Sequence, residues 1–235
     1  MSAIEQKAAA AAAALSYVED GMIIGLGSGS TAELFVRFLA DVIEDRELSI
    51  HGIPTSEGTA EVAREHGVPL LPIEQAHRID LTVDGADEVD GHFRLIKGGG
   101  GCLLREKLIA NASDLMVVII DETKLVSTLG AFPLPVEVDR FGFTITAKKV
   151  FDALRKAGVK QPDVSLRRLG DGLEPYLTDG GNYILDCACG EIANAEAAAR
   201  LLNTLPGVVE HGLFLDLARV VIVGEDEETA RVMEL

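Results

Sequence analysis

The feature that most constrains the fold is a regular alternation of short apolar, β-branched runs with segments of helical periodicity. Strands are predicted at 22–26, 48–53, 79–83, 93–96 and 115–120, and helices at 3–18, 31–44, 57–66 and 102–111. Strands that alternate with helices build parallel sheets whose connections cover both faces. This part of the chain therefore predicts an α/β fold with a Rossmann-like, mostly parallel sheet and helices on both faces.

The rhythm changes near residue 131. The predicted order becomes strand 134–139, helix 144–157, strand 164–169, strand 182–188, helix 191–203 and strand 207–214. The order β-α-β-β-α-β is typical of a ferredoxin-like α+β domain. We therefore predict a small domain at 131–214, with strand 219–224 returning to the main sheet. The main domain then comprises 1–130 and 215–235.

Composition narrows the range of partners. The 235 residues carry 38 acidic and 21 basic side chains, for a net charge of −17. That charge opposes binding to nucleic acid or to an anionic membrane, and a phosphorylated ligand would need a local positive pocket. A salt-adapted protein and an ordinary acidic enzyme fit this balance equally well.

The cysteines and the N-terminal segment bear on location. Three cysteines give no disulfide framework and suit a reducing cytoplasm, where Cys187 and Cys189 are expected to pack in the core rather than bind metal. The alanine-rich start has Glu5 in its leader and Glu19 directly after it, so it predicts a first helix rather than a signal peptide. No apolar run reaches transmembrane length.

Residues that can carry chemistry follow each predicted strand. The segments are GSGST (27–31), TSEGTA (55–60), DGADEVD (84–90), KGGGG (97–101) and DETK (121–124). Ligands of open parallel sheets bind beyond the carboxyl ends of the strands. The sequence therefore predicts that glycines, hydroxyls, carboxylates and lysines gather at one edge of one sheet.

The first of these segments fits a single phosphate group. Glycines between a strand and a helix let backbone N–H groups point at an anion, and Ser30 and Thr31 add hydroxyls. Ser30 replaces the third glycine of a dinucleotide fingerprint, and the Gly-Lys-Ser/Thr of a Walker A loop is missing. An ordinary glycine turn in an α/β unit is the alternative.

The acidic segment places Asp84, Asp87 and Asp90 three residues apart, which is not the alternate spacing of a calcium loop. Asp84 directly ends an apolar strand, which favours a carboxylate aimed into a cleft. Carboxylates there could accept hydrogen bonds from sugar hydroxyls or move a proton. A magnesium site and a solvated acidic turn stay open as alternatives.

The helix predicted at 102–111 carries Arg105, Glu106 and Lys107 among apolar residues. Successive helical residues turn by about 100°, so these charges point in well-separated directions. The neighbours of Glu106 one turn away are apolar, which makes Glu106 the candidate to enter the cleft as a base. The glycines before the helix leave N–H donors for an oxyanion, and Lys97 adds a positive charge.

Taken together, these motifs resemble the A-type ribose-5-phosphate isomerase family. The resemblance covers nearly the whole chain, and "DGADE" followed by "KGGGG" and "REK" is its most specific part. It implies reversible conversion of D-ribose 5-phosphate to D-ribulose 5-phosphate in the non-oxidative pentose phosphate pathway, without a metal or organic cofactor. It also implies a cytoplasmic homodimer or homotetramer.

The resemblance also assigns roles. It implies that Glu106 shuttles a proton between C1 and C2 through an enediol. Asp84 and Asp87 would open the ring and bind hydroxyls, and Lys97 would stabilise the oxyanion. Substrate contacts are further implied for Ser28, Gly29, Ser30, Thr31, Gly85, Ala86, Gly98, Gly99, Gly100, Lys124 and Lys7.

Departures from the family pattern are few. Ser28 stands where threonine is common, Leu104 replaces a frequent threonine, and Cys102 lies in a loop that is usually alanine-like. Two other functions remain as hypotheses. One is a sugar-phosphate-sensing module of the same fold without turnover. The other is acyl-CoA transfer with a glutamate nucleophile, although no second large domain is predicted to hold CoA.

Overall fold

The computed structural model describes residues 2–226 and 229–235. The chain forms two compact units, which are described separately. Unit 1 comprises Met1–Ala86, Arg105–Leu125 and Asp216–Leu235, and unit 2 comprises Asp87–Leu104 and Val126–Leu215. No helix within the described residues is long and apolar enough to cross a membrane.

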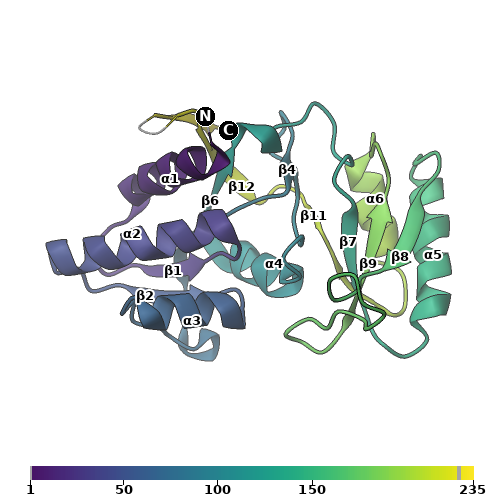
Figure 1. Cartoon of the computed structure of the whole chain (residues 1–235), viewed down its shortest axis with the longest axis horizontal. Coiled ribbons are helices and arrows are strands. Elements are labelled where there is room, and N and C mark those ends of the chain that lie inside the picture. Colours follow the sequence, from purple (N-terminus) through teal and green to yellow (C-terminus); the bar gives the residue numbers. More distant parts are fainter. Residues whose placement is uncertain (1, 227–228) are drawn as a thin grey trace. The chain divides into compact units, whose positions relative to one another are not determined.

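The sheet of unit 1 has the strand order β13-β12-β6-β3-β1-β2 (Figure 1). The strands are β1 Ile23–Leu26, β2 His51–Pro54, β3 Ile79–Asp84, β6 Ser113–Asp121, β12 Ala218–Gly224 and β13 Ala230–Glu234. All neighbouring pairs are parallel except β12 and β13, which are antiparallel. The predicted mostly parallel sheet and the return of strand 219–224 to it are confirmed.

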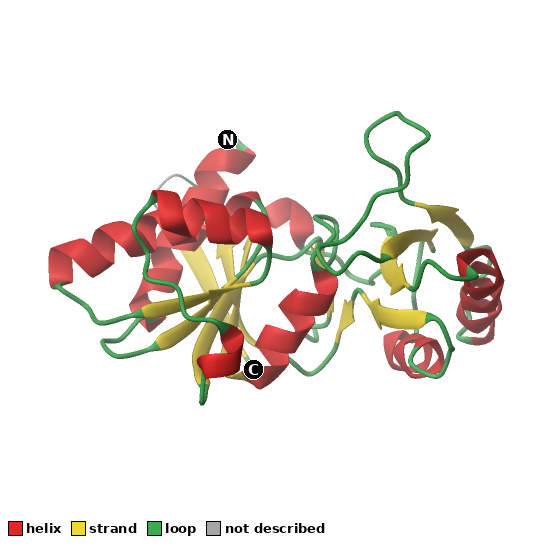
Figure 2. Ribbon diagram, turned by 90° about the horizontal axis from the view of Figure 1, so that it is seen from below, coloured by secondary structure: helices red, strands yellow, loops and turns green. Residues whose placement is uncertain are grey.

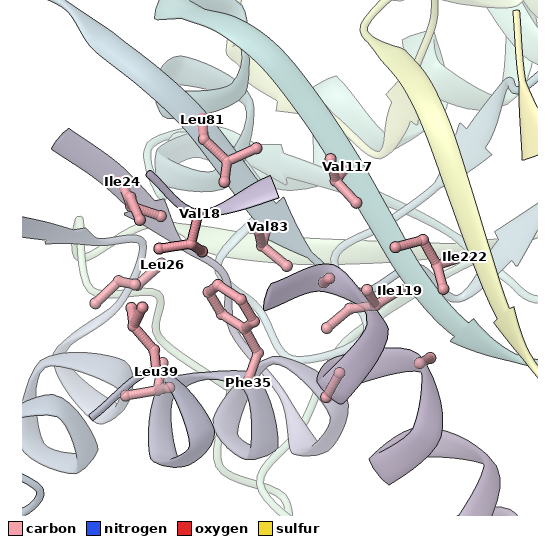
Figure 3. Close-up of a cluster of buried hydrophobic side chains, with 14 of the residues drawn as sticks. Val18, Ile24, Leu26, Phe35, Leu39, Leu81, Val83, Val117, Ile119 and Ile222 are labelled. Atoms are coloured by element: carbon pink, nitrogen blue, oxygen red, sulfur yellow. The ribbon is translucent and has the colours of Figure 1, made fainter. Parts of the chain in front are cut away.

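Helices cover both faces of this sheet (Figure 2). They are α1 Ala3–Ala14, α2 Ser30–Arg46, α3 Glu57–Glu65 and α4 Leu103–Ala112, with single 3₁₀ turns at Leu15–Tyr17, Ile73–Gln75 and Glu122–Lys124. Phe35 and Leu39 of α2 pack on side chains of β1, β3 and β6, as Figure 3 shows. On the other face, Ile109 of α4 lies against the sheet, where a methyl group at Gly25 would come within 2.5 Å of its Cγ2.

Helix α1 lies close to the sheet because its contact residues are small. Ala10, Ala11 and Ala14 are fully buried in the core. The backbone of Gln6 rests directly on Gly224, where a side chain would overlap it. Ser2 and Glu5 form a capping box at the start of the helix. The alanine-rich segment is therefore a structural helix, as predicted.

Unit 2 contains an antiparallel sheet with the order β10-β7-β9-β8. Its elements follow one another as β7 Leu134–Val138, α5 Phe143–Lys156, β8 Asp163–Leu166, β9 Tyr183–Ala188, α6 Ala195–Leu202 and β10 Val208–His211. Buried residues of α5 and α6 pack with Val136, Leu185 and Cys187 on one face of the sheet. The predicted ferredoxin-like arrangement is confirmed.

One predicted strand is misplaced. The segment 93–96 was expected in the main sheet, but only β5 Leu95–Ile96 is a strand, and it lies in a small antiparallel sheet of order β11-β5-β4. Its neighbours are β4 Glu88–Val89 and β11 Leu213–Phe214. Phe93 has φ +58°, so the strand cannot extend backwards. The prediction for 93–96 was wrong because a short apolar run does not reveal which sheet it joins.

The predicted strand 207–214 is interrupted. β10 pairs with β7 and β11 pairs with β5, and Gly212 separates them. The Gly212 N–H donates to the Pro135 carbonyl at 2.8 Å, and the Gly212 carbonyl accepts from the Lys97 N–H at 2.9 Å. The compact units also differ from the predicted domains, because 87–104 packs with unit 2. Whether the predicted ranges are separate folding domains stays a prediction.

Candidate active site

The carboxyl edge of the unit 1 sheet carries the first group of predicted site residues. β1, β3 and β6 are parallel neighbours, so their carboxyl ends meet at one edge. The turn 27–31 follows β1, Asp84 ends β3, and Lys124 lies in the 3₁₀ turn after β6. For these segments the predicted convergence at one edge is confirmed.

Asp84 is fully buried and fixes the turn after β1. Its Oδ1 accepts the N–H of Ser28 at 3.1 Å and that of Gly85 at 2.7 Å. A side chain at Gly27 would overlap the Asp84 carboxylate. Position 27 must therefore be glycine to leave room for this carboxylate. This packing accounts for Gly27 without a dinucleotide-binding motif.

The start of α2 forms a cradle for an anion. Gly29 has φ +96° and is exposed, and α2 begins at Ser30 without a side-chain cap. The first N–H groups of a helix lack partners within the helix, so they are available to an anionic ligand. Lys7 of α1 reaches the same point, because its Nζ donates to Ser30 Oγ at 3.1 Å.

Ser28 is bound into a chain of hydroxyl groups behind the cradle. Its Oγ lies 2.7 Å from Thr55 Oγ1 and donates to Ser56 Oγ at 2.8 Å. Ser56 Oγ donates to Thr59 Oγ1 at 2.9 Å, which in turn donates to the Gly27 carbonyl at 3.0 Å. Both the N–H and the hydroxyl of Ser28 thus have internal partners, and its contact with substrate stays a prediction.

Glu106 is buried, with 4% of its surface exposed, in the first turn of α4. Its apolar neighbours Leu103 and Ile109 are buried as well. Arg105 instead points to Glu57, whose carboxylate lies 2.9 Å from Nη1. The hydrogen bond from Arg105 lowers the pKa of Glu57. The predicted divergence of the charged run is confirmed, and Glu106 is the member that leaves the solvent.

Unit 2 holds Asp87 and the glycine loop, Gly98–Gly101. The Gly99 N–H donates to Asp87 Oδ2 at 2.8 Å, and a methyl group at Gly99 would lie 2.5 Å from Oδ1. Gly98 and Gly101 have φ +104° and +84°, a region that favours glycine. Gly100 has neither restriction, since a methyl group there would meet nothing within 4 Å. Its backbone is open to a ligand.

Lys97 directly follows β5 and is buried, with 2% of its surface exposed. Its Nζ lies 5.6 Å from the centroid of the Phe214 ring, within range of a cation–π interaction. Because β5 belongs to the small sheet, the segment 97–101 does not follow a strand of the main sheet. The prediction that this segment follows a strand of the main sheet was wrong. Asp87 and Asp90 follow β3 but are assigned to unit 2, and their place at the edge of the main sheet stays a prediction, as does that of Lys97.

Several residues that shape these loops were not predicted from the sequence. Thr55, Ser56 and Thr59 form the hydroxyl chain, and only their position after a predicted strand hinted at a role. Arg167 and Tyr176 bind carbonyl groups of the glycine loop. They stand in a polar stretch with no recognisable motif, so no sequence signal pointed to them.

A magnesium site at the acidic segment 84–90 was one alternative left open by the sequence. Within residues 2–226 and 229–235, no three or more His, Cys, Asp or Glu side chains are grouped so as to hold a metal ion. Asp84 and Asp87 instead receive backbone N–H groups of the neighbouring turns. Independence from a metal or organic cofactor stays a prediction.

The geometry described so far defines a class of protein. A buried glutamate, carboxylates held by backbone N–H groups, a helix start with a lysine, and a buried lysine before a glycine loop are groups that acid–base enzymes use on small anionic substrates. Comparison with known proteins is specific. The profile of ribose 5-phosphate isomerase A (phosphoriboisomerase A) matches residues 51–228.

Whole-chain relatives agree. A ribose-5-phosphate isomerase A from Maricaulis maris is 66% identical over 235 residues, covering 100% of both chains. The ribose 5-phosphate isomerase A structure from Methanocaldococcus jannaschii has a TM-score of 0.88 at 38% identity, covering 97% of this chain and 98% of that one. A D-ribose-5-phosphate isomerase in complex with phospho-erythronic acid has a TM-score of 0.92 at 37% identity, with 100% coverage of both chains. This chain belongs to the ribose 5-phosphate isomerase A family.

Proposed function

We propose that this protein interconverts D-ribose 5-phosphate and D-ribulose 5-phosphate. The observation that carries the proposal is the buried carboxylate of Glu106, in a chain that matches the family along its whole length. Aldose–ketose isomerisation needs a base at the carbon that loses its proton, a group that stabilises the resulting oxyanion, and an anchor for the rest of the sugar. The described residues offer a candidate for each.

Glu106 is the proposed base. It would remove the proton from C2 of the open-chain aldose and return it to C1, through an enediol intermediate. Burial shields the carboxylate from bulk water, which limits exchange of the proton during the transfer. A positioned general base contributes roughly 10²–10⁴-fold to the rate.

The carbonyl oxygen at C1 gains negative charge during this step. Lys97 and the loop Gly98–Gly100 are the proposed partners of that oxygen, and the donors of the loop are those N–H groups that, unlike the Gly99 N–H, are not bonded to Asp87. Such donors contribute roughly 10²–10³-fold each. Asp84 and Asp87 are proposed to open the furanose ring and bind sugar hydroxyls, with Gly85 and Ala86 contributing backbone contacts. Carboxylates already oriented by backbone N–H groups would need little rearrangement.

The phosphate is proposed to bind at the start of α2. The N–H groups of Gly29, Ser30 and Thr31 and the ammonium of Lys7 support this assignment, and Lys124 after β6 is proposed to close over the ligand. The relative that was solved with phospho-erythronic acid binds a ligand with a phosphate and a carboxylate. We propose that the same compound inhibits this protein, because its planar, negatively charged carboxylate resembles the planar, negatively charged O–C=C–O group of an enediolate.

A coupled spectroscopic assay with ribose 5-phosphate, run with and without a chelator, tests the reaction and its metal independence together. Glu106→Gln should lower kcat by about 10³-fold or more while ribose 5-phosphate still binds. Glu57→Gln is the control, because it removes an exposed carboxylate one ion pair away from α4. Near-normal turnover by Glu106→Gln would show that the base is misassigned.

The alternative, a sensing module, makes a different prediction. The unmodified protein would then bind ribose 5-phosphate, detected by calorimetry, without producing ribulose 5-phosphate. Covalent attachment of a CoA thioester to Glu106, detected by mass spectrometry, would instead support acyl transfer.

We also propose a cytoplasmic homodimer or homotetramer that binds pentose 5-phosphates and has no nucleic-acid or membrane partner. Family membership and the net charge of −17 support this. Light scattering coupled to size exclusion gives the oligomeric state directly, and a monomer at micromolar concentration would contradict the proposal.

A further inference from the structure

Within unit 2 the carbonyl oxygens of the glycine loop are held by side chains of the ferredoxin-like sheet. We propose that Arg167 is a positioning residue for catalysis. By fixing the carbonyls of Gly98 and Gly99, it directs the loop's N–H groups to the oxygen that becomes charged. This inference rests on the proposed isomerase reaction.

Arg167 binds the loop and an anchor simultaneously. Its Nη1 donates to the Gly98 carbonyl at 2.9 Å and to the Gly99 carbonyl at 3.1 Å. Its Nε and Nη2 donate to the two oxygens of Asp186 at 2.9 Å and 2.5 Å. Only 13% of the Arg167 side chain is exposed. A buried bidentate pair of this kind fixes the guanidinium in one orientation.

The pairing of β8 with β9 places this guanidinium. Arg167 directly follows β8, and its N–H donates to the Ile184 carbonyl at 2.8 Å, which continues the antiparallel ladder. Asp186 lies two residues beyond Ile184 on β9, so it is a diagonal neighbour of Arg167 on the same face. Val136 and Leu185, on the opposite face, pack with α5 and α6.

The glycine loop lies on the face that carries Asp186. Pro135 of β7 pairs with Asp186 and shares its face, and a methyl group at Gly98 would lie 3.2 Å from Pro135 Cγ. The glycine loop therefore packs on the face of the β10-β7-β9-β8 sheet that is opposite to α5 and α6.

Tyr176 adds a second clamp. Its hydroxyl donates to the Gly100 carbonyl at 3.2 Å, and its ring lies 5.8 Å from the Arg167 guanidinium carbon. A side chain at Gly101 would overlap the ring. Consecutive carbonyls from Gly98 to Gly100 are thus all bonded to side chains of unit 2.

Fixing a carbonyl fixes the next N–H, because a trans peptide is planar and its C=O and N–H point in opposite directions. The Gly99 N–H donates to Asp87, and the Gly101 N–H donates to the Gly98 carbonyl. The Gly100 N–H belongs to the peptide whose carbonyl Arg167 holds. In the described part of the chain it has no internal acceptor, which makes it the donor that Arg167 aims at substrate.

The composition of the loop explains why a clamp is needed. Glycine loses more backbone freedom on ordering than any other residue, so an unsupported run of glycines would not present a donor in one direction. A guanidinium supplies donors in a fixed fork, which lets one side chain bind a carboxylate and two carbonyls. A lysine has the charge but not the fork.

The test compares Arg167→Lys with Arg168→Lys. Arg168 is the matched control, because its Nη1 binds the Leu173 carbonyl outside the loop. We expect Arg167→Lys to lower kcat by about 10–100-fold with KM for ribose 5-phosphate changed by less than about threefold, since a small displacement of a catalytic group has effects of this size. The inhibition constant of phospho-erythronic acid should rise in parallel with the loss in kcat, and Arg168→Lys should change neither.

A merely structural role for Arg167 would lower thermal stability and active fraction without this selective loss of kcat. Active-site titration with the inhibitor therefore accompanies each variant. Folded Arg167→Lys with kcat within twofold of the unmodified protein would overturn the inference while leaving the proposed reaction intact. If the unmodified protein does not turn over ribose 5-phosphate at all, the proposed reaction fails and the inference fails with it.

Tyr176→Phe keeps the inference testable if Arg167→Lys does not fold. It removes the hydroxyl that binds Gly100 and retains the ring beside Arg167. We expect kcat to fall by about 3–10-fold at an unchanged melting temperature, because one of the carbonyl bonds is lost. In that case an unchanged kcat would overturn the inference.

Discussion

The two glycine-rich turns of this chain, Gly27–Gly29 in unit 1 and Gly98–Gly101 in unit 2, differ in which of their groups are bound by side chains. The first is held by a backbone N–H and a hydroxyl, through the bonds of Ser28 to Asp84 and to the hydroxyl chain. In the second, Arg167 and Tyr176 bind three successive carbonyls, and Asp87 binds one N–H group, that of Gly99. In both turns an exposed glycine, Gly29 or Gly100, has an N–H group with no acceptor among the described residues.

The difference matches the charges that the turns are proposed to meet. The phosphate keeps its charge throughout the reaction, so a helix start with a lysine is sufficient to bind it. The oxygen at C1 gains charge only as the proton leaves, and its stabilisation requires donors that are already fixed. Carbonyls clamped by side chains would let a flexible glycine run supply such donors.

The largest expected effect is a difference in alkylation rate between Cys102, next to the second turn, and the two cysteines Cys187 and Cys189. Cys102 follows the glycine loop and is half-buried, whereas burial raises the pKa of Cys187 well above its ordinary value and that of Cys189 to about 12. Since the thiolate is the reactive form, Cys189 has a thiolate fraction of about 10⁻⁴ at pH 8. We expect iodoacetamide to modify Cys102 at least about 10³-fold faster, as measured by peptide mass spectrometry.

Two internal checks accompany that measurement. In urea the three cysteines should react at similar rates, and in the native protein the Cys189 rate should rise about tenfold per pH unit, because its thiolate fraction does. Comparable native rates for Cys102 and Cys189 would contradict the burial on which the comparison depends.

Lysine substitutions separate the two turns kinetically. Lys97→Ala should lower kcat by about 10²-fold with little change in KM, because its charge is needed when the oxyanion forms. Lys7→Ala should raise KM by about tenfold with kcat retained, because phosphate binding is the same in substrate and transition state. Lys124→Ala is expected to behave like Lys7→Ala. If Lys97→Ala raised KM and Lys7→Ala lowered kcat instead, the roles proposed for the two turns would be wrong.

Two glycine substitutions distinguish a glycine needed for packing, Gly27, from one proposed to let a ligand approach, Gly100. Gly27→Ala should lower the free energy of unfolding by about 1–3 kcal/mol, because the methyl group displaces the Asp84 carboxylate. Gly100→Ala should leave it unchanged or raise it by about 0.5 kcal/mol, since no steric contact forms and the unfolded chain loses freedom. Urea unfolding measures both. Activity of Gly100→Ala should nevertheless fall, and full activity would show that the ligand does not approach this backbone.

Ser28→Ala tests the hydroxyl chain, and its expected effect is smaller than that of Gly27→Ala. Losing one hydroxyl leaves its neighbours with fewer partners and should lower the free energy of unfolding by about 1 kcal/mol. Ser30→Ala is the control, because its exposed hydroxyl lies outside the hydroxyl chain and accepts a hydrogen bond from Lys7, so its loss should affect KM rather than stability. Equal stability of the two variants would show that the hydroxyl chain does not stabilise the first turn.

Local patterns were sufficient to predict most elements. The buried β-branched runs and the apolar periodicity of α2 and α5 gave their bounds to within a few residues, and the apolar neighbours of Glu106 indicated its burial. Helix α6 begins later than predicted, because Asn194 caps it and Ile192 packs in the loop before it. The edge strand β13 went unpredicted because Arg231 and Val232 are exposed and show no alternation of burial.

The features that could not be predicted depend on pairing between distant segments. Whether Leu95 and Ile96 join the main sheet is decided by their partners Leu213 and Phe214, not by their own sequence. The contact of Arg167 with the glycine loop likewise requires the register of β8 against β9. Local propensity contains no information on such registers.

The position of β12 between β6 and β13 has a consequence for biosynthesis. During translation, the main sheet cannot be completed until residues 218–224 have left the ribosome, because β6 awaits its parallel neighbour. The partner of β5, at 213–214, emerges only shortly before. Nascent chains released earlier would expose an unpaired hydrophobic strand edge, a feature that promotes aggregation and that chaperones recognise.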